Sequence, residues 1–143
     1  MKLDAKIDWQ DGLAFRAHLD GFDFIIDGPQ TSGGRNLGPR PKGLTLVSLL
    51  GCTGMDVISI LGKMKVKVDK FEVAAEAILA EEHPKKILAI KVKYFFQGTD
   101  LNPELLQKAI ALSEDKYCGV RATLIPTVAI SHEIYLNTQK ISG

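Results

Sequence analysis

The sequence predicts an α+β fold in which a long buried central helix packs on antiparallel sheets, in the order βββ-α-ββ-αα-β. Three observations support this prediction. Residues 2–26 alternate apolar and polar side chains in three short runs, residues 44–65 form a long apolar segment, and residues 66–96 contain two further runs. Because the strands are mostly consecutive, we expect antiparallel neighbours rather than a doubly wound parallel sheet.

The first three strands are predicted at Lys2–Trp9, Leu13–Leu19 and Phe22–Ile26, where apolar side chains alternate with charged ones. Asp11-Gly12 and Asp20-Gly21 separate these runs. Both dipeptides tolerate the positive φ angles of tight hairpin turns. The three runs therefore predict an antiparallel meander.

The segment Gly28–Lys42 follows and breaks all periodicity, because glycine and proline punctuate it. It also contains Arg35 and Arg40. A loop of this length in a small protein is often functional. We expect it to deliver the chain to the central helix.

The central helix is predicted at Leu44–Lys65, the longest apolar segment of the chain. Its polar residues recur at steps of three and four and share one stripe: Thr45, Ser48, Cys52, Asp56, Ser59 and Lys63. A helix that is apolar over the rest of its surface is expected to be buried. The charges of Asp56 and Lys63 favour a core helix over a membrane span. Three glycines predict close approach of another backbone: Gly51, Gly54 and Gly62.

The C-terminal half adds two strands, a helix pair and a last strand. The strands Val66–Ala80 and Lys86–Phe96 form a predicted hairpin. Asn102 and the following Pro103 predict a helix start, and this helix ends near Leu112. A shorter helical stretch around Cys118 ends near position 124, and a final strand covers Thr127–Leu136. The residues after it are expected to fray.

The 143 residues predict a single domain, 1–143, with 18 basic against 17 acidic side chains. This balance argues against a nucleic-acid partner. The N-terminus has no secretory apolar region, so we expect a cytoplasmic protein without a membrane partner. No CxxC or HExxH spacing is present, so no metal or cofactor is expected. Small sheets from one chain cannot cover a helix that is apolar all round, which predicts a homodimer.

Cys52 and Cys118 are the only thiols of the chain. Free cysteine is often simply a small buried hydrophobe, and this interpretation stays open. Against it, Cys52 lies on the polar stripe of the central helix, and Cys118 lies near a helix start beside Lys116, where a thiolate is favoured. An arginine-rich loop also precedes the Cys52 helix, and a guanidinium stabilises an ionised thiol.

Four polar residues have weaker claims to a role. Asp56, one turn beyond Cys52, would raise the pKa of the thiol if it is close and ionised. His18 is expected on a solvent face, and His83 in a hairpin turn. His132 falls on the apolar phase of the last strand and is expected to be a hydrogen-bonded core histidine.

Three segments resemble the OsmC/Ohr family, the osmotically inducible and organic-hydroperoxide-resistance proteins. They are GPRPKGLTLVSLLGCTGMDVISILGKM, FEVAAEAILAEEHPKKI and ALSEDKYCGVRATL, in this order. The resemblance implies an intertwined α+β homodimer that reduces organic hydroperoxides in oxidative-stress defence without a cofactor. By position, it implies that Cys52 is the peroxidatic and Cys118 the resolving cysteine, and that an external thiol or dithiol regenerates them.

The chain departs from the family pattern at the residues that assist the thiol. The family's glutamate falls ten residues before the cysteine, where this chain has Lys42. Arg35 best fits the family's arginine, and Arg40 and Arg16 are rivals. The departure indicates a divergent OsmC-like branch. It keeps an alternative open, namely a weakly active or non-catalytic dimer that binds a small apolar ligand.

Overall fold

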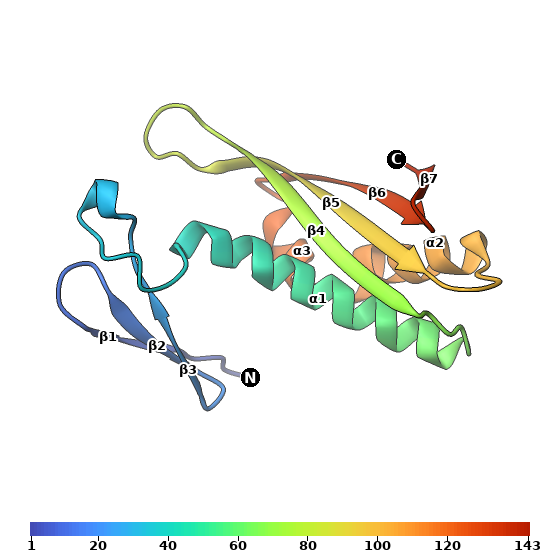
Figure 1. Cartoon of the computed structure of the whole chain (residues 1–143), viewed down its shortest axis with the longest axis horizontal. Helices are drawn as coiled ribbons and strands as arrows, with labels where there is room; N and C mark the ends of the chain where they lie inside the picture. Colours follow the sequence, from blue (N-terminus) through green and yellow to red (C-terminus); the bar gives the residue numbers. More distant parts are fainter. The chain divides into compact units, whose positions relative to one another are not determined.

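The computed structural model describes residues 1–143, which form seven strands and three α-helices (Figure 1). The chain groups into two compact units, Met1–Thr45 and Leu46–Gly143. The α+β fold class is confirmed, and the single domain stays a prediction.

The first unit contains the predicted meander. Strands β1 (Lys6–Trp9), β2 (Phe15–Leu19) and β3 (Phe22–Ile26) form an antiparallel sheet in this order. Leu19 pairs with Phe22, so the turn between them has two residues, Asp20 and Gly21, with φ of 54° and 82°. These positive angles are the ones that an Asp-Gly hairpin turn favours.

The loop after β3 is held by the buried carboxylate of Asp27, which is 3% exposed. Its oxygens accept hydrogen bonds from the backbone N–H groups of Gly28, Arg35 and Leu37 at 2.7, 3.1 and 3.2 Å. A Cβ at Gly38 would lie 1.9 Å from the carbonyl oxygen of Ile25, so only glycine fits there. The segment contains one short 3₁₀ turn, η1 (Gln30–Ser32), and backbone hydrogen bonds such as Gly34 N–H to the carbonyl oxygen of Pro29 at 2.9 Å add to these contacts.

Helix α1 (Pro41–Lys63) begins with a proline, which suits the first turn of a helix. Its buried residues form one stripe at steps of four: Leu49, Thr53, Val57 and Leu61. Met55 and Ile58 are 75% and 47% exposed. Only one face of α1 packs on its sheet within the single chain. This agrees with the prediction that the small sheets of one chain cannot cover the whole helix, and the second copy that would cover the rest stays a prediction. No other backbone lies within 4 Å of a Cβ built at Gly51, Gly54 or Gly62.

The second unit contains a four-stranded sheet. Its strands are β4 (Lys70–Leu79), β5 (Ile87–Gln97), β6 (Ala129–Leu136) and β7 (Gln139–Ser142), in this order. β4 and β5 form the predicted hairpin, and β6 runs parallel to β5 because helices connect them. The expected fraying of the C-terminus is wrong, since β7 pairs with β6.

The β6–β7 turn explains this correction. Leu136 pairs with Gln139, and the intervening Asn137 and Thr138 have φ of 48° and 73°. Asn137 suits this conformation, but threonine is β-branched and rarely adopts it, so the usual turn signal is absent from the sequence. The side-chain amide of Asn137 also holds the backbone N–H and carbonyl of Gly98 at 3.1 and 3.0 Å.

The crossover from β5 to β6 consists of α2 (Pro103–Leu112), the π-helical turn η2 (Ser113–Tyr117) and α3 (Gly119–Leu124). Asn102 caps α2 as predicted, accepting a 2.9 Å hydrogen bond from the N–H of Glu104. Helices α1, α2 and α3 lie along one face of the sheet (Figure 1). The core between them contains buried residues from both layers: Leu49, Val57, Leu61, Ile90, Val92, Tyr94, Phe96, Leu106, Ile110 and Ile134.

Candidate functional site: two thiols and a carboxylate

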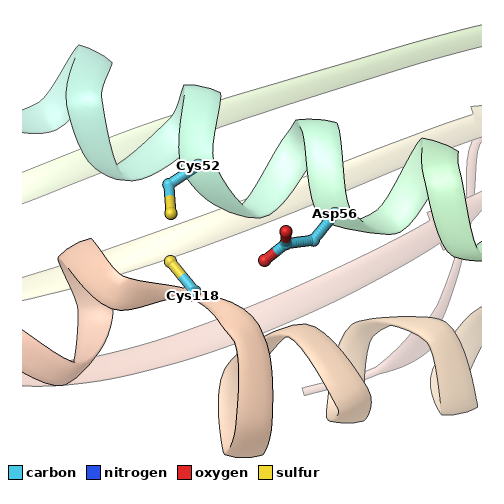
Figure 2. Close-up of side chains that lie close together, drawn as sticks. All are labelled: Cys52, Asp56 and Cys118. Atoms are coloured by element: carbon cyan, nitrogen blue, oxygen red, sulfur yellow. The ribbon is translucent and has the colours of Figure 1, made fainter.

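Cys52 from α1 and Cys118 from the start of α3 face each other within the second unit (Figure 2). Their Sγ atoms and a carboxylate oxygen of Asp56 all lie within 4.8 Å of one another. The fold thus brings together two sulfurs that are far apart along the chain. Both cysteines are free thiols, Cys52 half-buried and Cys118 buried.

Local structure sets the positions of these three groups. Cys52 and Asp56 are four residues apart on α1, so they share one face of the helix. Cys118 is the N-cap of α3, and its extended backbone follows directly after the π-helical turn. The N–H of Cys118 donates to the carbonyl oxygen of Ser113 at 2.7 Å, and its Sγ accepts from the N–H of Arg121 at 3.4 Å. These contacts turn the thiol toward α1.

A buried chain of hydroxyl groups leads to the carboxylate of Asp56. The Oγ of Ser113 donates to Asp56 Oδ2 at 2.9 Å. Because its single proton is used there, Ser113 accepts from the hydroxyl of Thr53 at 2.9 Å, and Thr53 in turn accepts from the phenol of Tyr94 at 2.8 Å. Tyr94, Thr53 and Ser113 are each at most 2% exposed. The chain satisfies all three buried hydroxyls and fixes one oxygen of Asp56.

Burial dominates the protonation of this cluster. It raises the pKa of the Tyr94 phenol, which keeps that group a hydrogen-bond donor. The pKa of the Cys118 thiol is raised to about 11, mainly by burial, with smaller contributions from the nearby Cys52 and Asp56 and against the lowering effect of the N–H of Arg121. The prediction that the helix start favours a thiolate at Cys118 is therefore wrong, because desolvation of the buried thiol outweighs the stabilisation that the N-terminus of a helix of only six residues provides.

A second polar pair lies on the sheet side of the crossover. His132 Nδ1 is 2.8 Å from Glu114 Oε1, and this contact raises the pKa of the imidazole although burial opposes it. The half-buried His132 also meets the edge of the Tyr94 ring. The guanidinium of Arg121 donates to the carbonyl oxygen of Glu114 at 3.0 Å. His132 is thus hydrogen-bonded as predicted, but it is half-buried rather than part of the core.

The three candidate arginines all belong to the first unit. Arg35 Nη2 donates to the carbonyl oxygens of Gln10 and Asp11 at 2.7 and 3.1 Å. Arg40 donates to the carbonyl oxygen of Gly38 at 3.0 Å, and Arg16 pairs with Asp23 at 3.2 Å. A role of any of them at the thiol stays a prediction.

Sequence reasoning did not identify Thr53, Tyr94 or Ser113 as parts of the site. One signal was present in the sequence. Thr53 lies on the same helix face as the buried apolar residues of α1, and a hydroxyl group buried there needs a hydrogen-bond partner. The partners come from β5 and from the start of η2. Nothing local to Thr53 identifies them.

A pocket of about 380 Å³ lies beside the carboxylate of Asp56. Its apolar lining comes from Ile60, Met64 and Leu112, and Lys63 adds a cation. Asp56 therefore lies between the two sulfurs and an apolar pocket. Such an arrangement suits a small ligand with an apolar body and a reactive group at one end.

The fold and the thiol pair together define an α+β protein in which a long helix presents one cysteine to a second cysteine inside the crossover between two strands of the sheet. The chain belongs to the OsmC-like protein family, whose pattern it matches over residues 33–133. It is 32% identical over 131 residues to Protein YhfA of Escherichia coli K12, which covers 91% of this chain and 95% of that protein.

Two solved structures show the same fold. A hypothetical protein of Aquifex aeolicus has a TM-score of 0.80 and 27% identity, covering 96% of this chain and 98% of that one. The organic hydroperoxide resistance protein OhrB of Bacillus subtilis has a TM-score of 0.61 and 19% identity, covering 94% and 98%. The predicted OsmC/Ohr resemblance is thus confirmed.

Proposed function

We propose that the protein reduces organic hydroperoxides, with Cys52 as the attacking and Cys118 as the resolving cysteine. The observation that carries this proposal is the approach of the two sulfurs to within 4.8 Å, one half-buried and one buried. The accessible thiol suits an incoming peroxide, and the enclosed one suits a later, internal step. The relation to OhrB of Bacillus subtilis, named for organic hydroperoxide resistance, supports the same activity.

The proposed reaction has three steps. The Cys52 thiolate attacks the O–O bond, becoming a sulfenic acid while the peroxide leaves as an alcohol after taking up a proton. The Cys118 thiol then attacks the Cys52 sulfenic acid, forming a disulfide and releasing water. Two electrons from an external thiol or dithiol restore both thiols by exchange. A reducing cytoplasm provides such reductants, so we place the protein there.

Asp56 is suited to assist the second step. Cys118 has a raised pKa of about 11, so at neutral pH it holds a proton that must leave as its sulfur attacks. The Asp56 carboxylate lies within 4.8 Å of both sulfurs. We assign to it the transfer of this proton from Cys118 toward the departing oxygen of the sulfenic acid. Ser113 keeps the carboxylate in place through its 2.9 Å hydrogen bond.

The pocket beside Asp56 suggests the class of peroxide. Its apolar lining of Ile60, Met64 and Leu112 suits an alkyl or fatty acyl chain, and Lys63 suits a carboxylate at the far end of such a chain. Hydrogen peroxide would gain nothing from these side chains. Turnover on cumene hydroperoxide is therefore expected to exceed turnover on hydrogen peroxide.

A homodimer and Arg35 complete the proposed site. Exposed apolar side chains on both units support a second copy of the chain: Trp9, Phe22, Val47, Met55 and Ile58. We retain Arg35 as the guanidinium that stabilises the Cys52 thiolate and the departing oxygen. Its support is its position in the loop and the family resemblance.

The experiment that tests the function measures hydroperoxide consumption with a dithiol reductant by the wild type, Cys52→Ser and Cys118→Ser. Cys52→Ser is expected to lose turnover. Cys118→Ser, assayed without the dithiol, is expected to consume one equivalent of peroxide per chain and to stop at the sulfenic acid, because no second thiol condenses with it. Mass spectrometry of the wild type after one equivalent of peroxide should find a bridge between the two cysteines. Equal turnover by all three proteins, or by none, would refute the proposal.

One observation favours a second candidate function. The position of the family's glutamate is Lys42, and the pocket beside Asp56 is large enough for a small apolar ligand. A protein of this fold that binds such a ligand without efficient turnover would show ligand binding that persists in Cys52→Ser. The peroxide assay above distinguishes the two candidates.

A further inference from the structure

The cluster of Cys52, Asp56 and Cys118 also has the composition of a metal site. Two sulfurs and one carboxylate oxygen, each from a different side chain, lie within 4.8 Å of one another. Figure 2 shows the three side chains converging on one point between α1 and the start of α3. The sequence has no metal-binding spacing, because the two cysteines are far apart and only the fold joins them.

The distances are close to those that a tetrahedral ion requires. Zinc binds thiolate sulfur at about 2.3 Å and carboxylate oxygen at about 2.0 Å, so tetrahedral angles put two sulfurs about 3.8 Å apart and a sulfur and an oxygen about 3.5 Å apart. The donor atoms of the cluster need to approach by only about 1 Å, which small side-chain rotations provide.

The groups around the cluster are those that orient metal ligands. Ser113 donates to Asp56 Oδ2 and leaves the other oxygen free, and the backbone N–H of Arg121 donates to the sulfur of Cys118. Thr53 and Tyr94 hold Ser113 in turn. Hydrogen bonds of this kind fix ligand orientation in metal sites and affect affinity by about 10- to 100-fold.

We propose that the reduced protein binds one thiophilic divalent cation of the zinc class through Cys52 Sγ, Cys118 Sγ and the Asp56 carboxylate, with water at the fourth position. Soft thiolates select such ions over magnesium or calcium. Binding releases the protons of the two thiols and changes no oxidation state. The bound ion occupies the electron pairs of both sulfurs, so it blocks their oxidation. A disulfide would in turn exclude the ion.

The test uses the full chain, reduced and free of metal, and does not involve peroxide. Titration with zinc against a chromophoric chelator is expected to give one ion per chain. Cobalt, used as a spectroscopic probe, is expected to show thiolate-to-metal charge-transfer absorption. Cys52→Ser and Cys118→Ser should each weaken zinc binding at least about 100-fold, and Asp56→Asn and Ser113→Ala about tenfold or more.

Two controls separate loss of the site from loss of the fold. Asp115→Asn removes an exposed carboxylate near Ser113 and should bind zinc as the wild type does. If a cysteine variant does not fold, the wild type alone decides, because zinc should slow alkylation of Cys52 by iodoacetamide at least about tenfold. Wild-type protein without charge-transfer absorption or without protection of Cys52 overturns the proposal. So does undiminished binding in a folded Cys52→Ser, Cys118→Ser or Asp56→Asn protein.

Discussion

Ser113 donates a 2.9 Å hydrogen bond to Asp56, although 57 residues separate them. The bond joins the first residue of η2 to the middle of α1, close to the two thiols. It also ends the chain of hydroxyls that begins at Tyr94 in the sheet. The carboxylate beside the sulfurs is therefore oriented from the core of the protein rather than by solvent.

The middle of the hydroxyl chain predicts a large stability effect. Thr53→Val removes the acceptor of the buried Tyr94 hydroxyl and the donor to Ser113, which keeps its bond to Asp56. The change should lower the free energy of unfolding by about 1–3 kcal/mol. Tyr94→Phe removes only the end of the chain and should cost less. Urea denaturation measures both. Thr123→Val, which removes an exposed hydroxyl, is the control, and an equal effect of Thr53→Val and Thr123→Val would contradict the chain.

Asp56→Asn tests the proposed proton transfer. The amide cannot take the proton of Cys118, so disulfide formation should slow about 100-fold while the reaction of Cys52 with peroxide continues. Loss of the negative charge also lowers the pKa of Cys118, but burial remains the main cause of its high value. Sulfenic acid should therefore accumulate and be trapped by dimedone. Disulfide formation at the wild-type rate would exclude Asp56 from this step.

His132 predicts a pH-dependent part of the stability. Its hydrogen bond with Glu114 raises the pKa of the folded imidazole above its unfolded value of about 6.5. The protonated pair therefore stabilises the fold fully below that value, and the gain is lost as the pH rises through the folded pKa. Urea denaturation across pH 5–9 measures this loss of stability, which should be smaller in His132→Gln than in the wild type. His83→Gln, which changes an exposed histidine, is the control. An identical pH profile in wild type and His132→Gln would contradict this account.

The choice among the three arginines is testable by activity. Arg35→Ala should lower kcat/KM for an organic hydroperoxide about 100-fold if its guanidinium stabilises the reacting charge. Arg35→Lys should recover only part, because an ammonium cannot replace the planar donor set. Arg16→Ala and Arg40→Ala are the matched controls, each expected within about twofold of the wild type. A larger loss in either control would transfer the role to that residue.

The exposed face of α1 predicts the oligomeric state. Met55 and Ile58 are 75% and 47% exposed, and a charged residue at either position would place a charge in a dimer interface. Met55→Glu and Ile58→Glu should therefore shift the protein from dimer to monomer in sedimentation experiments. Lys63→Glu, also on α1 but polar in the wild type, is the control. A wild-type protein that sediments as a monomer would refute the dimer.

Local patterns in the sequence determined most of the elements. The alternation of apolar and polar residues predicted strands β1–β5, Asp20-Gly21 predicted the turn between β2 and β3, and Asn102 predicted the start of α2. These predictions were possible because each signal depends on only a few neighbouring residues. The family resemblance on the Cys52 and Cys118 segments is likewise confirmed. The turn at Asn137 was missed because it uses a threonine where glycine is usual.

Tertiary structure alone decided what surrounds the thiols. The sequence assigned Cys52 and Cys118 as a pair only by resemblance, and the crossover between β5 and β6 is what brings their sulfurs within 4.8 Å. It also decided that Cys118 is a buried thiol of raised pKa, since desolvation depends on the packed neighbours and not on the adjacent Lys116. Periodicity reports which face of an element is apolar, whereas contacts between distant elements set hydrogen bonds, burial and protonation.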